Sequence, residues 1–130
     1  MIHVVVYGSY RRGMSNGQTL QEYGKYHGIA KLSGFFMYKL RHENFPRVER
    51  AMNSEYCIIA EKWEVPDKIF YRMHGLEVEF GYYLDAIMLD GKVYFIWLSY
   101  PMRNCGEYVL IPNGDWKKYY GGDIDEGMEN

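Results

Sequence analysis

Residues 2–10 have the sequence IHVVVYGSY, in which an apolar run ends abruptly at a glycine. The run is rich in β-branched residues and lacks helical spacing, which predicts a buried strand over residues 2–7. Gly8 and Ser9 end this strand, and further glycines mark the loop that follows. We therefore expect a first strand whose carboxyl end leads directly into a loop of polar and aromatic residues.

The following residues carry both strand and helix patterns. Further strands are expected at residues 29–40, 48–52 and 56–65. Gly34 lies inside the first of these and indicates a bulge or a close backbone approach. A short helix is expected at residues 17–22, with Asn16 as its cap, and another helix should begin near Pro66. This mixture of strands and short helices predicts a mixed α+β domain with a curled sheet.

A hairpin is the clearest local pattern in the second half of the chain. Residues 83–89 and 92–100 are both rich in strand-forming residues and flank the pair Asp90-Gly91. An Asp-Gly pair between two such runs predicts a type I′ turn. After the hairpin, residues 113–116 have the sequence NGDW, which predicts a turn that leads into a short helix.

Composition and charge limit the classes of function. The length of 130 residues fits one domain, which we place at residues 1–120. Residues 121–130 form an acidic, glycine-rich tail that we expect to be disordered. The net charge of −2 provides no basic field for nucleic acid, and we expect the pair Arg11-Arg12 to be solvated surface.

Targeting signals and metal motifs are not indicated. No signal peptide and no apolar run near 18 residues is present, so we expect a cytoplasmic protein without membrane insertion. The two cysteines lack metal spacing. The four histidines are His3, His27, His42 and His74. No pair of them has the spacing of a known metal motif, so we expect structural or surface roles and no metal site.

Four segments together resemble one known family. Residues 6–13, VYGSYRRG, followed by Asn16, resemble the opening signature of the γ-glutamylcyclotransferase-like proteins, also called AIG2-like or γ-glutamylamine cyclotransferase-like. The later segments EKWEV at residues 61–65, MHGLE at 73–77 and NGDWKKY at 113–119 are similar to further family segments. All four occur in the order of the family, which makes the resemblance cover nearly the whole chain.

The resemblance implies a fold and an activity. The implied fold is a small mixed β-barrel flanked by short helices, with a pocket at the carboxyl end of the first strand. The implied reaction is the intramolecular cyclisation of a γ-glutamyl amine or peptide to 5-oxoproline, with release of an amine and without a cofactor. The implied partner is a small γ-glutamyl substrate, and neither nucleic acid nor a membrane is expected.

The resemblance also assigns site residues. Glu77 occupies the position of the catalytic glutamate of the family, and a tyrosine follows it a few residues later. The substrate-binding residues that we expect are Tyr7, Gly8, Ser9, Tyr10, Asn16, Tyr82 and Tyr83. Glu79 is the local rival for the acidic role, because it would share a face with Glu77 in a strand and diverge by about 200° in a helix.

The chemistry explains why these residue types are needed. The α-amine of the γ-glutamyl group attacks its own γ-carbonyl, so one carboxylate can take a proton from the amine and return it to the leaving group. Apolar neighbours of Glu77 would raise its pKa by desolvation. The amides of Gly8, Ser9 and Tyr10 could bind a carboxylate or an oxyanion, although a tight turn that binds nothing has the same pattern.

Three differences from the family pattern keep other functions open. Tyr10 replaces the usual leucine, His74 replaces an aspartate, and Leu84 and Asp85 stand where an arginine is often found. A non-catalytic module on the same fold could use the pocket for a small carboxylate ligand or a protein partner. A domain this rich in tyrosine could also be an interaction module that uses exposed aromatic residues.

Overall fold

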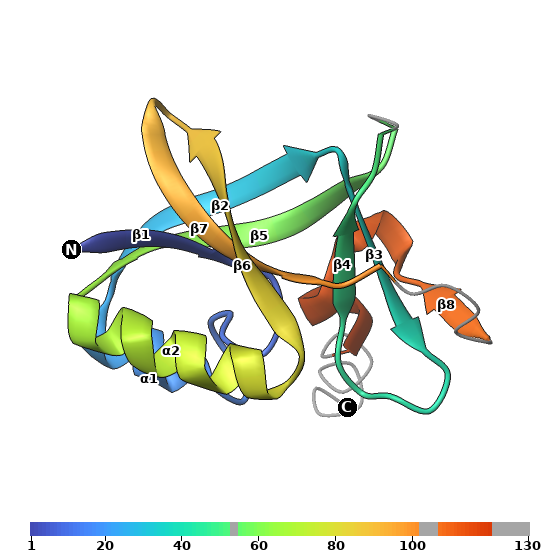
Figure 1. Cartoon of the computed structure of the whole chain (residues 1–130), viewed down its shortest axis with the longest axis horizontal. Helices are drawn as coiled ribbons and strands as arrows, with labels where there is room; N and C mark the ends of the chain where they lie inside the picture. The colour runs from blue at the N-terminus through green and yellow to red at the C-terminus, as the bar shows by residue number, and fades with distance from the viewer. Residues whose placement is uncertain (53–54, 102–106, 121–130) are drawn as a thin grey trace, which may run out of the picture.

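The computed structural model describes residues 1–52, 55–101 and 107–120, and the predicted tail at 121–130 lies outside them. The strands are β1 (Ile2–Val6), β2 (Lys25–Ser33), β3 (Phe35–Leu40), β4 (Arg47–Arg50), β5 (Cys57–Val65), β6 (Tyr82–Leu89), β7 (Lys92–Ser99) and β8 (Tyr108–Leu110). The helices are α1 (Gly17–Tyr23), α2 (Asp67–Glu79) and the 3₁₀ helix η1 (Pro112–Gly114). Together they form a mixed α+β fold (Figure 1).

The described strands form two sheets. One has the order β2-β5-β1-β7-β6 and the other has the order β4-β3-β8. In the first sheet β1 pairs antiparallel with β5 and parallel with β7, so this sheet is mixed. Neither of these two sheets closes on itself through the described strands, and the predicted barrel is therefore not confirmed.

Strand β1 is buried on both of its faces, as predicted. Val4 and Val6 pack with Trp63 and the helices in one core cluster, while Val5 and Tyr7 belong to a second cluster. Because neither face meets solvent from Val4 to Val6, this part of the strand is continuously apolar and does not alternate. Both helices α1 and α2 contribute to the first cluster, and Figure 1 shows them on the same side of the five-stranded sheet.

The predicted strand over residues 29–40 is wrong in one respect, because the chain forms two strands there. β2 ends at Ser33 and β3 begins at Phe35, and each belongs to a different sheet. Gly34 between them has φ of 82°, a left-handed conformation that favours glycine and interrupts a strand. Gly34 therefore marks a strand end, and the register shift of β2 lies elsewhere, between Tyr26 and Gly28.

Two other local predictions are confirmed. Asp90 and Gly91 have φ of 53° and 74°, as a type I′ turn between β6 and β7 requires. Helix α2 begins immediately after Pro66 and buries Ile69, Phe70 and Met73 against the sheet. Within the described residues, no helix has the length and apolar character that crossing a membrane would require.

Candidate active site

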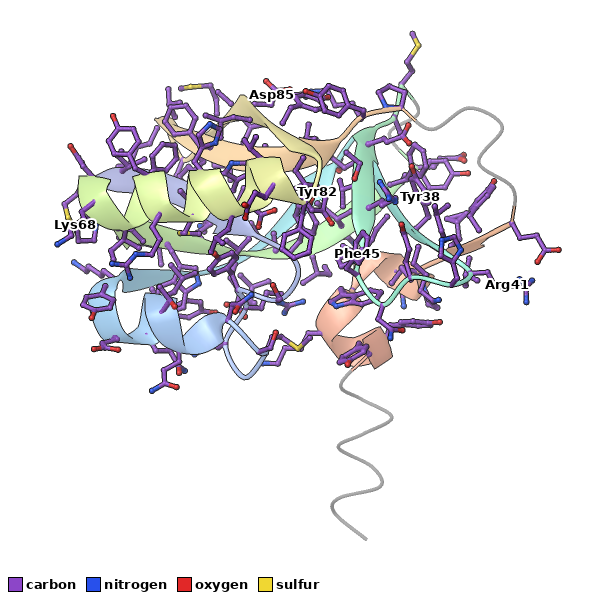
Figure 2. All side chains as sticks on the ribbon, turned by 60° about the horizontal axis from the view of Figure 1, so that its bottom comes forward. Tyr38, Arg41, Phe45, Lys68, Tyr82 and Asp85 are labelled. Carbon is purple, nitrogen blue, oxygen red and sulfur yellow. The ribbon has the colours of Figure 1, made fainter. Side chains whose placement is uncertain are left out.

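A cavity of about 440 Å³ opens at the carboxyl end of β1. Its size lies in the range typical of small-molecule sites. Its walls come from β1 and the loop after it, the β3–β4 connection, the end of α2, and the residues Tyr82, Trp97 and Trp116. Tyr82 and Phe45, which both line this cavity, are labelled in Figure 2. The cavity therefore has walls from the five-stranded sheet and from the connection between β3 and β4, two strands of the other sheet.

Glu77 is the acidic residue of this cavity. It lies in the last turns of α2, is partly buried, and lines the cavity. Burial raises the pKa of Glu77 to about 7, because the charged carboxylate is poorly solvated there. Glu79 also lies in α2 but is exposed and does not line the cavity. The helix thus separates the two carboxyl groups that a strand would have placed on one face.

Three tyrosines share the surroundings of Glu77. Burial and then the charge of Glu77 raise the pKa of Tyr10 to about 12. Burial and Glu77 likewise raise the pKa of Tyr82, and burial, Tyr82 and Glu77 raise the pKa of Tyr7. The Tyr7 hydroxyl donates to the Trp97 carbonyl over 2.5 Å. These phenols therefore stay protonated at neutral pH and can act as hydrogen-bond donors.

The Tyr82 hydroxyl, also near Glu77, holds part of the cavity wall in place. Tyr82 donates a 2.5 Å hydrogen bond to the carbonyl oxygen of Pro46, which belongs to the connection between β3 and β4. Tyr83 does not line the cavity, and its ring packs against Tyr100 with 4.8 Å between centroids. Consecutive residues of a strand face opposite sides, which explains why only one of this pair reaches the cavity.

The loop after β1 presents backbone amides with free donor capacity. Among the described residues, none accepts a hydrogen bond from the amide of Gly8, Ser9 or Tyr10. A Cβ atom on Gly8 would lie 3.1 Å from Cγ of Pro46, so the glycine permits a close approach. Gly8 does not have a positive φ, so the close approach to Pro46 is the feature that favours glycine here.

Asn16 closes this loop rather than capping α1. Its side-chain amide donates to Oγ of Ser9 over 3.0 Å, and its backbone amide donates to the Ser9 carbonyl over 2.8 Å. Asn16 occupies the N-cap position, but its side chain makes no capping hydrogen bond. Both residues line the cavity, so this pair holds the loop in its curved shape.

A buried carboxylate anchors the same loop to the sheet. Glu61 on β5 is 1% exposed and accepts hydrogen bonds from the Arg12 backbone amide over 2.9 Å and from the Trp63 indole over 3.1 Å. Arg11 Nε lies 3.3 Å from Glu61 Oε2. Arg11 is itself 5% exposed, so the expectation that it is solvated surface is wrong. A buried charge of this kind requires such partners.

The NGDW segment completes the anchor from the far end of the chain. Asp115 Oδ1 accepts hydrogen bonds from Arg11 Nη1 over 2.9 Å and from the Lys118 amide over 3.1 Å. The second bond caps the helix that begins at residue 116, and the sequence predicts a short helix at this place. Gly114 has φ of 63°, and a Cβ atom there would lie 2.1 Å from the Cys57 carbonyl oxygen. This geometry places Trp116 in the cavity wall.

His74 is tied to the sheet one turn before Glu77. The Trp97 indole donates a 3.0 Å hydrogen bond to Nδ1 of His74. That nitrogen is therefore an acceptor in this arrangement and carries no proton. His74 connects α2 to β7, whereas burial alone accounts for the raised pKa of Glu77.

Most residues predicted for the site meet in this cavity. Tyr7, Gly8, Ser9, Tyr10, Asn16, Glu77 and Tyr82 all line it. Sequence reasoning missed the wall formed by Asn44, Phe45, Pro46 and Trp97. No local motif marks these residues as neighbours of Glu77. Asn44, Phe45 and Pro46 lie in the connection between β3 and β4, and their position depends on how the two sheets meet.

Relatives with the same sequence pattern and fold are known. Residues 4–118 match the family described as gamma-glutamyl cyclotransferase, AIG2-like. A protein of Methanocaldococcus jannaschii that is provisionally named a gamma-glutamylcyclotransferase is 30% identical over 125 residues, which cover 93% of this chain and 100% of that protein.

Solved structures share the fold at lower identity. An uncharacterised protein of Pyrococcus horikoshii has a TM-score of 0.74 at 21% identity, over 100% of this chain and 99% of that chain. An AIG2-like protein of Mus musculus has a TM-score of 0.64 at 18% identity, over 80% of each chain. With the family match over most of its length, this chain belongs to the gamma-glutamyl cyclotransferase, AIG2-like family.

Proposed function

We propose that this protein cyclises a γ-glutamyl amine or peptide to 5-oxoproline and releases the amine, with Glu77 as general base and then general acid. One observation carries the proposal: the Glu77 carboxyl and the loop of Gly8, Ser9 and Tyr10 line the same cavity. Family membership supports the same class of reaction.

The loop amides would bind the negative groups of the substrate. No basic side chain is among the described residues that line the cavity. The amides of Gly8, Ser9 and Tyr10 have no acceptor among the described residues, so they are available to hold the α-carboxylate or the developing oxyanion. The Ser9–Asn16 pair and the Glu61 anchor would keep these donors in place before substrate arrives.

Glu77 would move one proton in two steps. Its pKa of about 7 lets the carboxylate take a proton from the α-ammonium group near neutral pH. The freed amine attacks the γ-carbonyl carbon, a C–N bond forms, and negative charge develops on the carbonyl oxygen. Collapse of this intermediate breaks the original γ-amide bond, and protonated Glu77 gives its proton to the leaving nitrogen. The extra proton on the new ring nitrogen passes to the released amine, which leaves as an ammonium ion. The carboxylate is then restored without a cofactor.

The cavity wall suggests which amines would leave readily. Phe45 and Phe80 both line the cavity, with 6.5 Å between their ring centroids, and Leu76 and Trp116 add further apolar surface. A lining without a basic side chain offers no strong partner for a carboxylate on the leaving group. We therefore expect γ-glutamyl amides of apolar amines to react faster than γ-glutamyl dipeptides.

The test is the release of 5-oxoproline from a panel of such γ-glutamyl amides, measured by chromatography. Glu77→Gln should lower kcat at least about 100-fold while circular dichroism stays unchanged, because it removes the proton carrier. Glu79→Gln is the matched control on the same helix and should stay close to wild type. Ligand binding by calorimetry without any turnover in the wild type would contradict the enzyme and favour a binding module.

A further inference from the structure

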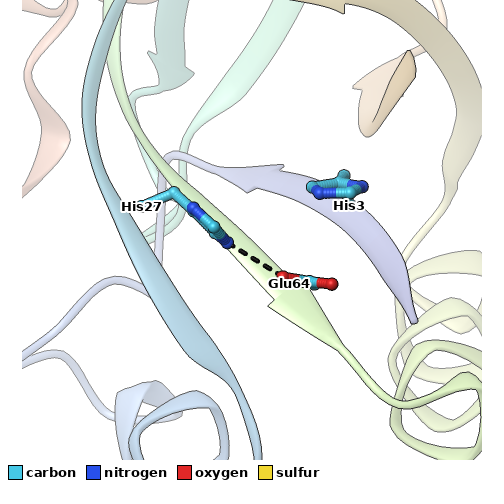
Figure 3. Close-up of side chains that lie close together, drawn as sticks. All are labelled: His3, His27 and Glu64. Atoms are coloured by element: carbon cyan, nitrogen blue, oxygen red, sulfur yellow. Dashed lines mark hydrogen bonds and ion pairs between the residues drawn. The ribbon is translucent and has the colours of Figure 1, made fainter. Parts of the chain in front are cut away.

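A second group of functional side chains lies on the five-stranded sheet, away from the cavity. His3, His27 and Glu64 come from β1, β2 and β5, respectively, and face one another (Figure 3). His27 Nε2 lies 3.0 Å from Glu64 Oε1, and one donor atom of each residue lies within 4.8 Å of the others. None of the three lines the cavity that contains Glu77.

Strand register explains why residues so far apart in sequence meet here. Glu64 on β5 pairs directly with His3 on β1. On its other side β5 pairs with β2, which has a register shift between Tyr26 and Gly28, so that His27 is the extra residue of a bulge. A bulge redirects a side chain, and here it brings His27 to Glu64. Sequence spacing could not reveal this cluster.

The donor set is one that binds transition metals. Two imidazoles and one carboxylate are ligands for Zn²⁺ and for neighbouring divalent ions. Bonds of about 2.0–2.1 Å in a tetrahedral site put ligand atoms about 3.3 Å apart, so a small closing rotation of the side chains is needed. The side chains of His27 and Glu64 are 25% and 23% exposed, which leaves room for this rotation and for water as a further ligand.

A simple His27–Glu64 hydrogen bond does not account for His3. Within the described chain His3 has no hydrogen-bond partner, and its ring only contacts those of His27 and Tyr94, with centroid distances of 5.8 and 5.0 Å. An imidazole with unused nitrogen atoms beside a histidine and a carboxylate matches the third ligand of a metal site.

We propose that His3, His27 and Glu64 bind one divalent transition-metal ion, for which Zn²⁺ is the probe. The site is separate from the cavity, because four residues of β1 at about 3.3 Å each place His3 about 13 Å from Tyr7. β2 is an edge strand of its sheet. The ion would hold this edge to β5 and β1, and so stabilise the folded state in proportion to its occupancy.

Calorimetry with Zn²⁺ alone tests the proposal on the full chain after treatment with a chelator. We expect one ion per chain, and a Kd that rises at least about tenfold in His27→Gln and in Glu64→Gln. His42→Asn is the matched control, because His42 is exposed and outside the cluster. Co²⁺ should show visible absorption in the wild type and lose it in the two cluster variants.

His3→Asn keeps the test valid if the other variants fold poorly. This change leaves the His27–Glu64 hydrogen bond intact, so the fold should be preserved, and the Kd for Zn²⁺ should still rise at least about tenfold. The proposal is overturned if the wild type does not bind Zn²⁺, if His3→Asn binds it as tightly as the wild type, or if His42→Asn weakens binding equally.

Discussion

Arg11 Nη1 donates a 2.9 Å hydrogen bond to Oδ1 of Asp115, which lies 104 residues later in the chain. Arg11 belongs to the loop that carries Gly8, Ser9 and Tyr10, and Asp115 precedes the cavity residue Trp116. The first and last family segments therefore meet in one ion pair beside the cavity. In this chain the ion pair positions two walls of the cavity relative to each other.

Substitutions at Asp115 should separate its two contributions. Asp115→Asn keeps a good helix cap but removes the charge that pairs with Arg11, so we expect a loss of about 1–2 kcal/mol in the free energy of unfolding. Asp115→Ala removes both interactions and should lose about 1 kcal/mol more. Urea denaturation followed by circular dichroism measures both. Equal losses in the two variants would show that the cap contributes nothing.

Glu77 should reduce stability at high pH. Its pKa rises from the ordinary value of 4.5 to about 7 in the folded protein. Below pH 4.5 the Glu77 carboxyl is protonated in both the folded and the unfolded state. Between pH 4.5 and 7 it ionises only in the unfolded state, so the free energy of unfolding falls as pH rises. Above pH 7 both states are ionised and the free energy of unfolding levels off. The full cost is at most about 3 kcal/mol.

Glu77→Gln removes this cost, so the variant should be more stable than wild type at pH 8 and equally stable at pH 4. Chemical denaturation at the two pH values gives the difference directly. Glu79 is exposed, so Glu79→Gln serves as the control and should show no pH-dependent gain in the free energy of unfolding. A gain for Glu77→Gln that is the same at both pH values would contradict desolvation as its cause.

Gly114 and Gly75 should respond oppositely to alanine. A Cβ atom on Gly114 would overlap the Cys57 carbonyl oxygen at a positive φ, so we expect Gly114→Ala to lose about 3 kcal/mol or more. Gly75 lies inside α2 with nothing within 4 Å of a new Cβ, so Gly75→Ala should gain about 1 kcal/mol. Thermal and urea denaturation measure both, and a tolerated Gly114→Ala would refute this packing.

Tyr82→Phe should loosen the cavity wall. It removes the hydrogen bond to the Pro46 carbonyl, and we expect a loss of about 1 kcal/mol in unfolding free energy together with a raised KM for the proposed substrates. Tyr83→Phe is the neighbouring control, and it should change stability by no more than about 0.5 kcal/mol and leave KM unchanged. If Tyr83→Phe changed KM more than Tyr82→Phe did, Tyr83 rather than Tyr82 would be the tyrosine that contacts the substrate.

Local patterns predict the elements well where one physical signal dominates. The apolar run of β1, the Asp90-Gly91 turn and the helix after Pro66 are each decided by residues adjacent in sequence. The division at Gly34 was missed because a single glycine can mark a bulge or a strand end, and the choice depends on which sheet lies nearby. The barrel was implied by resemblance, and the described strands form two open sheets.

The candidate site was predictable only in part. Glu77 and the residues after β1 lie in short segments that the family pattern marks, whereas Phe45 and Trp97 reach the cavity through sheet packing. The burial of Arg11 could not be predicted, because its partner Glu61 lies 50 residues away and a pair of arginines is normally solvated. Contacts between residues far apart in sequence cannot be predicted from the residues adjacent to either of them.

The connection between β3 and β4 forms one wall of the cavity, and this has a dynamic consequence. β4 is attached to the five-stranded sheet by the 3.3 Å hydrogen bond from the Val48 amide to Ser99 Oγ and by the 3.0 Å hydrogen bond from Arg50 Nε to Asp85 Oδ2. A ligand in the cavity would contact both this connection and the five-stranded sheet. It would therefore oppose the local opening that exposes the β4 amides to deuterium. Slower deuterium uptake by the β4 amides would therefore show that a ligand occupies the cavity.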